Sequence, residues 1–185
     1  AVERLKQRKE INEMNARLKE LAQRDLLTGI LNKIALERRA EHYLDRVEET
    51  GTVALLIFDL DNFKDINDSF GHPCGDYVLR ETAIKLKTVF HSGGEIGRIG
   101  GDEFAVVLSG EDVTHAKRMG EQMLPEISNI RWQNKPVGAS LSIGICLCSK
   151  PGVSYAQLYK EADGALYEAK NSGKGRCCVC SLTDR

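Results

Sequence analysis

Two glycines followed by two acidic residues, Gly100-Gly101-Asp102-Glu103, form the stretch best suited to chemistry. β-prone residues flank it at 96–99 and 104–108. Short β segments around a Gly-Gly pair predict a hairpin whose turn presents the carboxylates. The carboxylates of Asp102 and Glu103 suit a hard cation such as Mg²⁺, which also keeps phosphate and water ligands. Taken alone, an ordinary polar turn is the simpler interpretation of this stretch.

A second acidic group follows the most apolar run of the chain. Residues 53–58 contain no polar side chain, which predicts a strand buried on both faces. The run ends in Asp59-Leu60-Asp61. An acid at the end of a central strand is costly unless it lies at the solvent edge or pairs with a cation. We therefore expect this group to lie beside the Asp102-Glu103 tip.

Residues 62–76 form a polar stretch with embedded aromatic residues, which we interpret as a loop. Within it, Lys64 is a point charge suited to phosphate. Asn67 and Asp76 carry an amide and a carboxylate that can hydrogen-bond the edge of a guanine. The alternative for each residue is turn chemistry or helix capping, with Asp76 as an acid in a first helical turn.

A second pair of cations lies near the end of the chain. Lys170 and Lys174 surround Gly173, where we expect the last helix to end. Two lysines at a helix C-terminus suit the helix dipole, and they suit a polyphosphate equally well. The residues alone leave both interpretations open.

Apolar spacing of three and four residues predicts four helices that pack on a sheet. Caps at Asn32 and Asp112 mark the starts of the first and third helices. The buried positions expected are Leu36, Ala40, Tyr43 and Leu44 in the first helix, Leu79, Ala83, Leu86 and Phe90 in the second, Ala116, Met119, Met123 and Ile127 in the third, and Tyr155, Leu158, Tyr159, Ala162, Ala165, Leu166 and Ala169 in the fourth.

The remaining segments predict strands and turns. Residues 140–148 alternate between apolar and small side chains, which is typical of a half-buried strand. Residues 176–179 form a candidate closing strand, and residues 48–52 a polar turn. Because no repeat or low-complexity linker interrupts residues 25–185, we expect them to form one α/β domain.

Residues 1–24 are rich in Glu, Lys, Arg, Leu and Gln and contain no Gly or Pro. Their apolar positions Ile11, Met14, Leu18 and Leu21 follow the 3-4-3 spacing of a coiled-coil seam, and Val2 and Leu5 precede it out of phase. We expect a parallel dimer stalk here. The alternative is a single amphipathic helix docked on its own domain.

The composition is that of an ordinary globular protein, with 42% hydrophobic and 29% charged residues. A net charge of −1 gives no electrostatic reason to expect nucleic acid or an anionic membrane as partner. No apolar run approaches the ~18–20 residues that cross a bilayer. We expect a cytoplasmic domain without direct membrane contact, cut from a longer protein that can include a membrane-bound sensor.

Six cysteines occur in the chain, at positions 74, 146, 148, 177, 178 and 180. Their spacing matches no paired zinc framework. Since no secretory signal precedes them, reduced thiols are the default. We interpret the C-terminal cysteines as strand residues rather than metal ligands.

Five linked motifs resemble those of one known family, the GGDEF domains or diguanylate cyclases. The signature Arg98-Ile99-Gly100-Gly101-Asp102-Glu103-Phe104 is accompanied by residues 25–32, 58–64, 67–76 and 169–174, in order and at the right spacing. The resemblance spans about residues 25–180. It implies a fold like that of nucleotide cyclases and the polymerase palm, in which helices flank a mainly antiparallel sheet. It also implies condensation of two GTP into cyclic di-GMP with release of two pyrophosphates.

The resemblance assigns roles to the acidic residues and to Lys64. Asp59 and Asp102 correspond to carboxylates that hold Mg²⁺ or Mn²⁺, together with the carbonyl of Leu60. Glu103 matches an acid that supports the metal or the substrate, and Lys64 a residue that stabilises the transition state. Asp102 is the nearest candidate for deprotonating the attacking hydroxyl.

The resemblance also assigns residues to GTP. Asn67 and Asp76 match the guanine readers, and His72 lies beside them. The remaining substrate contacts, which belong to the signature turn and the triphosphate, are Gly101, the backbone amides of Asn62 and Phe63, Lys170, and Lys174. Many relatives have arginine at the position of Lys174, and lysine keeps the charge but loses the bidentate fork.

The implied reaction makes physical demands that the motifs meet. Attack of a ribose 3′-hydroxyl on an α-phosphate needs a metal that lowers the hydroxyl pKa and neutralises pyrophosphate, so carboxylates must converge from two strands. Each domain holds one GTP, whereas the product joins two. Two domains must therefore meet face to face in a homodimer, which residues 1–24 could arrange.

Two details refine this expectation. Asp76 keeps a carboxylate that accepts from guanine N1–H and N2–H₂, which favours cyclic di-GMP over mixed dinucleotides. Residues 91–94 read His-Ser-Gly-Gly, where many relatives carry an Arg-x-x-Asp product-inhibition site. We therefore expect weak or absent feedback through this site.

Two other functions stay open. One is a catalytically silent GTP-binding domain that regulates an attached partner, although its acids show no damage. The other is a structural dimerisation module carried by residues 1–24, which leaves the acidic tip unexplained.

Overall fold

The computed structural model describes residues 22–91, 93–110 and 113–183, together with residues 4, 6–9, 11, 12 and 14. Ile11 and Met14 are helical, with side chains 59% and 63% exposed. The other seam positions expected in residues 1–24 lie outside the described residues, so the stalk stays a prediction. The expected cap Asp112 and Ser92 of the 91–94 window also lie outside them.

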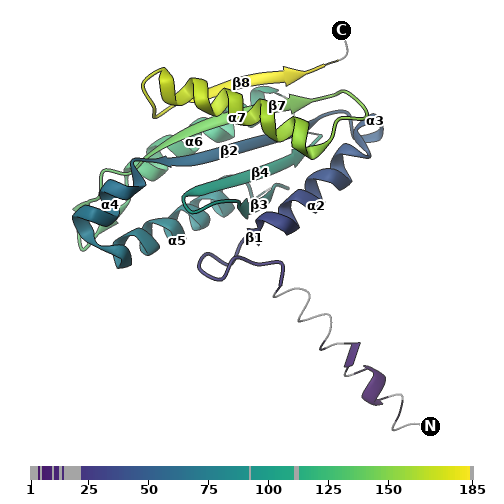
Figure 1. Cartoon of the computed structure of the whole chain (residues 1–185), viewed down its shortest axis with the longest axis horizontal. Helices are drawn as coiled ribbons and strands as arrows, with labels where there is room; N and C mark the ends of the chain where they lie inside the picture. The colour runs from purple at the N-terminus through teal and green to yellow at the C-terminus, as the bar shows by residue number, and fades with distance from the viewer. Residues whose placement is uncertain are drawn as a thin grey trace.

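Six strands form one mixed sheet in the order β1-β3-β4-β2-β7-β8 (Figure 1). The strands are β1 (Leu31–Asn32), β2 (Val53–Asp61), β3 (Glu95–Arg98), β4 (Glu103–Ser109), β7 (Ser140–Cys148) and β8 (Cys177–Leu182). The inner pairs are antiparallel, whereas β1 with β3 and β7 with β8 are parallel. A separate small hairpin joins β5 (Arg131–Trp132) to β6 (Lys135–Pro136). The expected α+β class with an antiparallel centre is confirmed.

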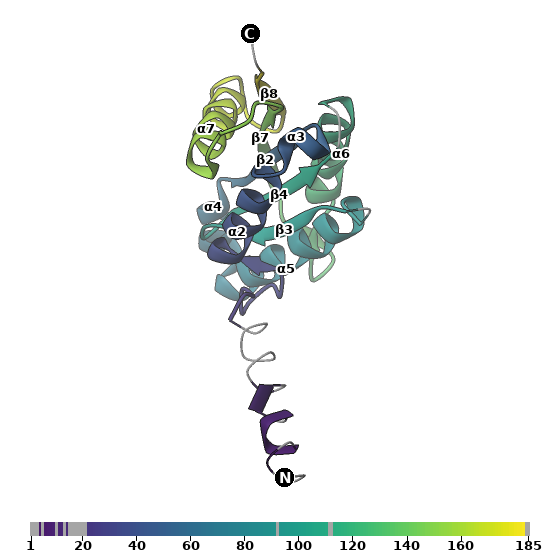
Figure 2. The same ribbon diagram turned by 90° about the vertical axis from the view of Figure 1, so that its right-hand side faces the viewer.

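Helices cover both faces of this sheet (Figures 1 and 2). They are α2 (Lys33–Leu44), α3 (Val47–Thr50), α4 (Phe63–Phe70), α5 (His72–Val89), α6 (Val113–Ser128) and α7 (Tyr155–Asn171). Helices α2 and α7 pack on one face, and α5 and α6 on the other. As the sequence predicts, Asn32 caps α2 by accepting from the Ala35 backbone amide at 3.0 Å.

The alternation of side chains along β2 divides the core into two halves. Val53, Leu55 and Ile57 pack beneath α2 and α7, while the even-numbered residues between them pack beneath α5 and α6. Successive strand residues point to opposite faces, so Asp59 and Asp61 continue the α7-facing row. The expected burial on both faces of this strand is confirmed.

Strand β2 runs through Asp61, so the acids stand at the end of a central strand as expected, and β7 pairs with it to the last residue. The sequence interpretation was wrong in three places. Strand β7 is buried on both faces, not half-buried, because α7 covers the side that carries small residues. Residues 48–50 belong to the short helix α3. The third place is the 62–76 stretch.

Residues 62–76 are helical rather than a loop. They form α4 and the first turns of α5, separated by Gly71. Gly71 has φ of +84°, which glycine adopts at little cost, so the chain can end one helix and begin the next within one residue. The polar side chains that suggested a loop are the exposed face of α4.

Candidate active site

The hairpin tip and the end of β2 meet side by side, as the sequence predicts. Asp59 is the register partner of Glu103 across the β2–β4 pair. The Leu60 amide donates to the Asp102 carbonyl at 3.2 Å, and the Ile99 amide donates to the Glu103 carbonyl at 2.9 Å. The three acids expected at this point therefore come from two neighbouring strands that the backbone holds in register.

Arg98 stabilises the turn of the acidic hairpin. Its guanidinium donates to the Gly101 carbonyl at 2.6 Å and pairs with Asp25 at 3.3 Å. The Asp25 carboxylate also accepts from the Thr28 hydroxyl at 2.6 Å. Burial alone would raise the pKa of Asp25, but the Thr28 hydrogen bonds and Arg98 together hold it below its usual value. Both residues belong to the motifs that carry the family resemblance, but the sequence does not indicate their joint role in positioning the turn.

The clustered acids repel one another. Burial raises the pKa of Glu103, and the nearby charges of Asp59 and Asp102 raise it further. Burial also raises the pKa of Asp59, only partly offset by its hydrogen bond to Lys170. The site thus carries more negative charge than its surroundings can stabilise, and a bound cation would relieve this.

Lys170 supplies a positive charge to this cluster from α7. Its ammonium lies 2.8 Å from Asp59 Oδ2, with side chains 35% and 12% exposed. Burial alone would lower the pKa of Lys170, but the bond to Asp59 and the charges of Glu103 and Asp102 raise it. The structure thus brings Lys170 into the acid cluster itself.

The donors present fit a hard divalent cation. Asp59, Asp102 and Glu103 offer carboxylate oxygens, and Leu60 offers a backbone carbonyl, the ligands that Mg²⁺ and Mn²⁺ prefer. As placed, no three His, Cys, Asp or Glu side chains of the described residues converge closely enough to hold an ion. The residues present nevertheless fit Mg²⁺ or Mn²⁺ by the chemistry of their oxygen donors, and Lys170 is paired with Asp59 in this structure.

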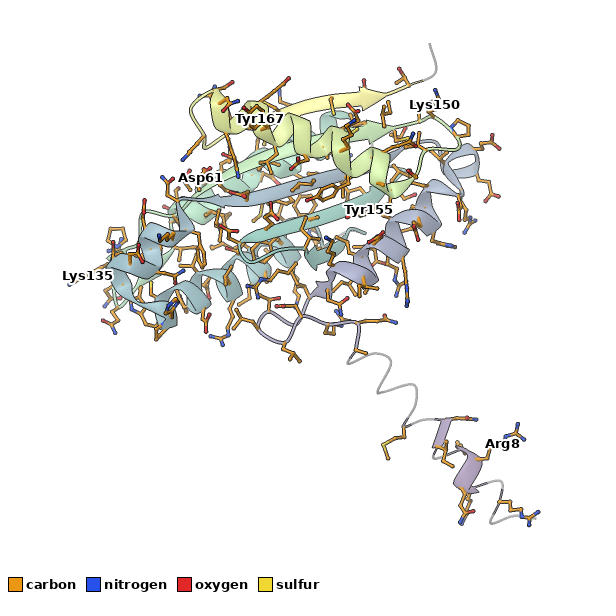
Figure 3. All side chains as sticks on the ribbon, viewed as in Figure 1. Arg8, Asp61, Lys135, Lys150, Tyr155 and Tyr167 are labelled. Atoms are coloured by element: carbon orange, nitrogen blue, oxygen red, sulfur yellow. The ribbon has the colours of Figure 1, made fainter. Side chains whose placement is uncertain are left out.

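Asp61 has a positioning role that the sequence analysis missed. Its carboxylate accepts from Ser142 at 2.7 Å, Ser140 at 2.8 Å and the Gly175 amide at 3.3 Å. Figure 3 labels it at the end of β2 near α4. Asp61 thereby ties β7 and the α7–β8 turn to the end of β2. The sequence feature that could have indicated this role is the second acid of Asp59-Leu60-Asp61, which lies on the same face of the strand as the first.

The turn that Asp61 holds presents Lys174 to the start of α4. The Lys174 ammonium lies 2.7 Å from Asn62 Oδ1. Both residues have positive φ, +62° and +54°. Asn62 is the N-cap of α4, yet its side chain caps no helix amide. The N-terminus of α4, at Asn62 and Phe63, thus lacks a side-chain cap and lies beside the Lys174 ammonium, an arrangement that suits phosphate.

The candidate guanine readers meet where α4 lies against α5. The Asn67 side chain lies so close to Gly75 that a Cβ there would overlap its amide oxygen. Asp76 follows Gly75 directly and is exposed in the first turns of α5. Asn67 therefore lies over the backbone beside Asp76, as recognition of a single base requires.

Lys64 and His72 remain apart from these clusters. Both are exposed, on the first turns of α4 and α5. Within the described part of the chain, neither side chain forms a hydrogen bond or ion pair with another residue. They border the site and are available to a ligand.

Fold and site together define an α+β domain in which an acidic hairpin closes against an acidic strand end. A family model described as diguanylate cyclase, GGDEF domain, matches residues 22–176. The chain therefore belongs to the GGDEF-domain family, which confirms the resemblance.

Two curated relatives illustrate the range of the family. Diguanylate cyclase DgcS of Shewanella oneidensis is 36% identical over 151 residues, which is 81% of this chain and 50% of DgcS. Cyclic di-GMP phosphodiesterase PdeR of Escherichia coli is 32% identical over 164 residues, 88% of this chain and 25% of PdeR. This chain spans half or less of the length of these relatives.

Solved structures match the fold closely. The coiled coil and GGDEF domain of DgcB from Caulobacter crescentus, in complex with c-di-GMP, has a TM-score of 0.88 at 26% identity, covering 97% of this chain and 96% of that one. The active GGEEF domain of a diguanylate cyclase from Vibrio cholerae has a TM-score of 0.75 at 31% identity, covering 82% and 98%.

Proposed function

We propose that this domain condenses two GTP molecules into cyclic di-GMP and releases two pyrophosphates. The observation that carries the proposal is the register pairing of Asp59 with Glu103, with Asp102 bonded to the next residue of β2. Acids from two strands meet at one point, as phosphoryl transfer assisted by a metal requires. Membership of the family supports the same reaction.

The acids would hold Mg²⁺ or Mn²⁺ through Asp59, Asp102, Glu103 and the Leu60 carbonyl. When bound, the metal would lower the pKa of the ribose 3′-hydroxyl and neutralise the leaving pyrophosphate. Asp102 would accept the hydroxyl proton. Lys64 would stabilise negative charge that develops on the transferred phosphoryl group.

The surrounding residues would bind GTP. The backbone amides of Asn62 and Phe63 open the N-terminus of α4 toward the triphosphate, and Lys174 lies 2.7 Å from Asn62 already. Lys170 would exchange its contact with Asp59 for a phosphate oxygen, while Gly101 leaves room for the ligand at the tip. Asn67 and Asp76 would read guanine, with His72 at the border of the pocket.

The product requires a second copy of the chain. One acid cluster with one base-reading corner accommodates a single GTP, so the two reacting nucleotides must come from facing domains. We infer a homodimer, which the helical N-terminal segment would bring together. Because GTP is the substrate, we place the domain in the cytoplasm.

Feedback by the product is expected to be weak. Residues 91–94 lack the Arg and Asp of the usual inhibition site. Gly94 instead lines a cavity of about 270 Å³ together with Arg24, Arg39, Lys87 and Glu95. The Arg39–Glu95 ion pair, 3.6 Å, already uses part of its positive charge. Low-micromolar inhibition by cyclic di-GMP, with binding mapped to residues 91–94, would show this inference to be wrong.

The reaction is tested directly with the purified chain, GTP and Mg²⁺, with cyclic di-GMP detected by mass spectrometry. Product formation should fall at least about 100-fold in Asp102→Ala, since the group that accepts the proton is lost. Glu48→Ala, on the exposed helix α3, is the matched acid control and should keep wild-type activity. Activity that survives Asp102→Ala would contradict the mechanism.

The second candidate is a GTP-binding domain without turnover. It is favoured by the relative named as a cyclic di-GMP phosphodiesterase, of which this chain matches only a quarter. Saturable GTP binding without product, in a chain shown to be dimeric, would select this alternative. The raised pKa values of Asp59 and Glu103 favour a cation at this site under either function, so the product assay decides between them.

A further inference from the structure

Two cysteines lie side by side in neighbouring strands, away from the acid cluster. Cys146 in β7 and Cys180 in β8 are register partners in the parallel pair. Neighbouring strands lie roughly 4.8 Å apart. Disulfide-bonded cysteines have Cα atoms about 4.4–6.8 Å apart, so the Cα separation expected of register partners falls within that range.

Both thiols belong to the face covered by α7. Cys146 is fully buried among the residues packed beneath α7, and Cys180 lies half-buried at the margin of the same group. The Cys180 thiol donates to the Glu161 carbonyl of α7 at 3.4 Å, and the Cys146 thiol donates to the Leu147 carbonyl at 3.8 Å. Because the two residues are register partners on the same face of the sheet, their side chains are neighbours.

The two sulfurs differ in reactivity. The neighbouring Cys146 thiol lowers the pKa of Cys180, although burial and the carboxylates of Glu161 and Glu168 oppose this shift. The neighbouring Cys180 thiol and burial raise the pKa of Cys146. The thiolate is the nucleophilic form of cysteine, and β8 is the edge strand of the sheet. Cys180 is thus the thiol that meets an oxidant first.

We propose that Cys146 and Cys180 form a disulfide when the protein meets a peroxide, so that the β7–β8 pair is a redox modification site. The Cys180 thiolate attacks hydrogen peroxide, the O–O bond breaks, and the released hydroxide takes a proton to become water. The sulfenic acid left on Cys180 is then attacked by the Cys146 sulfur. The S–S bond forms, and the second hydroxide leaves with the Cys146 proton as water.

The other cysteines of the described residues are poorly placed for the same step. Cys178 faces Gly144 across the strands, and Cys177 faces Ile143 on the opposite side of the sheet. Cys148 faces Leu182. A thiol-bound metal is a weaker alternative, because no three His, Cys, Asp or Glu side chains in residues 22–91, 93–110 and 113–183 are grouped to hold one.

The disulfide would join β8 to β7 at the edge of the sheet, away from the acid cluster. It closes a loop that contains all of α7, and closing a long loop stabilises a fold chiefly by restricting the unfolded chain. Cys146 pairs with Leu55 across β2, four residues before Asp59. That separation is roughly 13 Å along the strand, so we expect the acid cluster to keep its arrangement.

The test uses the 185-residue chain at low concentration. Wild-type protein is treated with hydrogen peroxide, unfolded, and alkylated with a maleimide. Intact mass then counts the remaining thiols, and peptide mapping without reductant locates any cross-link. Cys180→Ser is the test variant. Cys178→Ser, two residues away on the same strand and facing glycine, is the matched control.

We expect wild type and Cys178→Ser to lose two alkylation sites and two hydrogens each, with residues 146 and 180 in one linked peptide. Dithiothreitol should restore both sites. Oxidation should raise the Tm of both proteins by about 5 °C or more relative to their reduced forms. Cys180→Ser should show neither change.

The proposal fails if the cross-link joins other cysteines or two chains. It also fails if Cys180 proceeds to sulfinic acid in wild type with no disulfide. Each serine variant is also measured in its reduced form in the same experiment. A variant that fails to fold is thereby distinguished from one that folds but forms no cross-link. Production of cyclic di-GMP is not a readout here, so the proposal stands or falls independently of the proposed function.

Discussion

Arg98 and Asp25, 73 residues apart in the sequence, form an ion pair that connects the N-terminal turn of the domain to the acidic hairpin. The same guanidinium donates to the Gly101 carbonyl inside the turn. Side-chain exposures of 16% and 23% shield the pair from much of the solvent. The pair therefore fixes the turn that carries Asp102 against the N-terminal turn of the domain.

Loss of this pair should loosen the turn. We expect Arg98→Ala to lower the rate of cyclic di-GMP formation by about tenfold, since a charge-assisted bond and a turn contact are lost together. Asp25→Ala should have a smaller effect, and the double variant should be no worse than Arg98→Ala. Arg46→Ala, which removes the exposed pair with Glu49, is the control. Additive effects of the two substitutions would contradict the coupling.

Glu103→Gln should make the metal-free protein more stable at neutral pH. The folded state raises the pKa of Glu103 above its ordinary value of 4.5, so ionised Glu103 opposes folding. This cost is absent well below pH 4.5 and develops as the pH rises through the folded pKa. We expect Tm to rise by about 2 °C or more at pH 7.5, with the gain vanishing near pH 4.

Addition of Mg²⁺ supplies the complementary measurement for Glu103. Wild-type Tm should increase with Mg²⁺ because binding to the folded state stabilises it. Glu103→Gln should respond less, since one carboxylate is gone. A variant that is no more stable than wild type without metal would refute the interpretation of Glu103 as a repelled acid.

Gly75→Ala should weaken GTP binding while leaving the fold intact. The new Cβ would overlap the Asn67 side chain, which can rotate away at little cost to folding. Displacing that amide should raise KM for GTP by about tenfold, because one good hydrogen bond is lost. Gly164→Ala in α7 is the matched helical control, since a Cβ there meets open space. Steady-state kinetics measures KM for GTP in both variants. An unchanged KM in Gly75→Ala would show that Asn67 does not contribute to GTP binding.

Gly144→Ala should destabilise the domain. A Cβ at this β7 position would overlap the Ala162 carbonyl and the Leu166 amide of α7, which are backbone groups that cannot rotate away. We expect a loss of about 3 kcal/mol or more in urea unfolding, comparable to severe overpacking. Gly120→Ala is the comparison variant, because its Cβ would meet only side chains at 3.4 Å or beyond. It should lower the free energy of unfolding far less. Equal stability of the two variants would contradict this account of how α7 packs.

The amino-acid sequence determined the local parts of this protein. Periodicity gave the buried faces of α2, α5, α6 and α7, because a helix buries one stripe wherever it packs. The Gly-Gly pair and its flanking β segments gave the hairpin, and the apolar run before Asp59 gave the central strand. The pattern of apolar residues gave wrong predictions in two segments. Strand β7 was expected to be half-exposed because the sequence does not show that α7 covers its second face. Helix α4 was expected to be a loop because its polar face is wide.

The sequence predicted that Asp59 lies beside the hairpin tip, but only the tertiary structure decided the register of that contact and which other side chains join it. The register of β2 against β4 sets Asp59 opposite Glu103, and a shift of one residue would turn Asp59 to the other face. The pairing of Lys170 with Asp59 and of Arg98 with Asp25 joins segments far apart in the chain. Such contacts depend on the order of the strands in the sheet and on the packing of the helices. The spacing of residues along a sequence does not give the distance between elements in space. The same reason set Cys146 beside Cys180, which their positions in the sequence could not indicate.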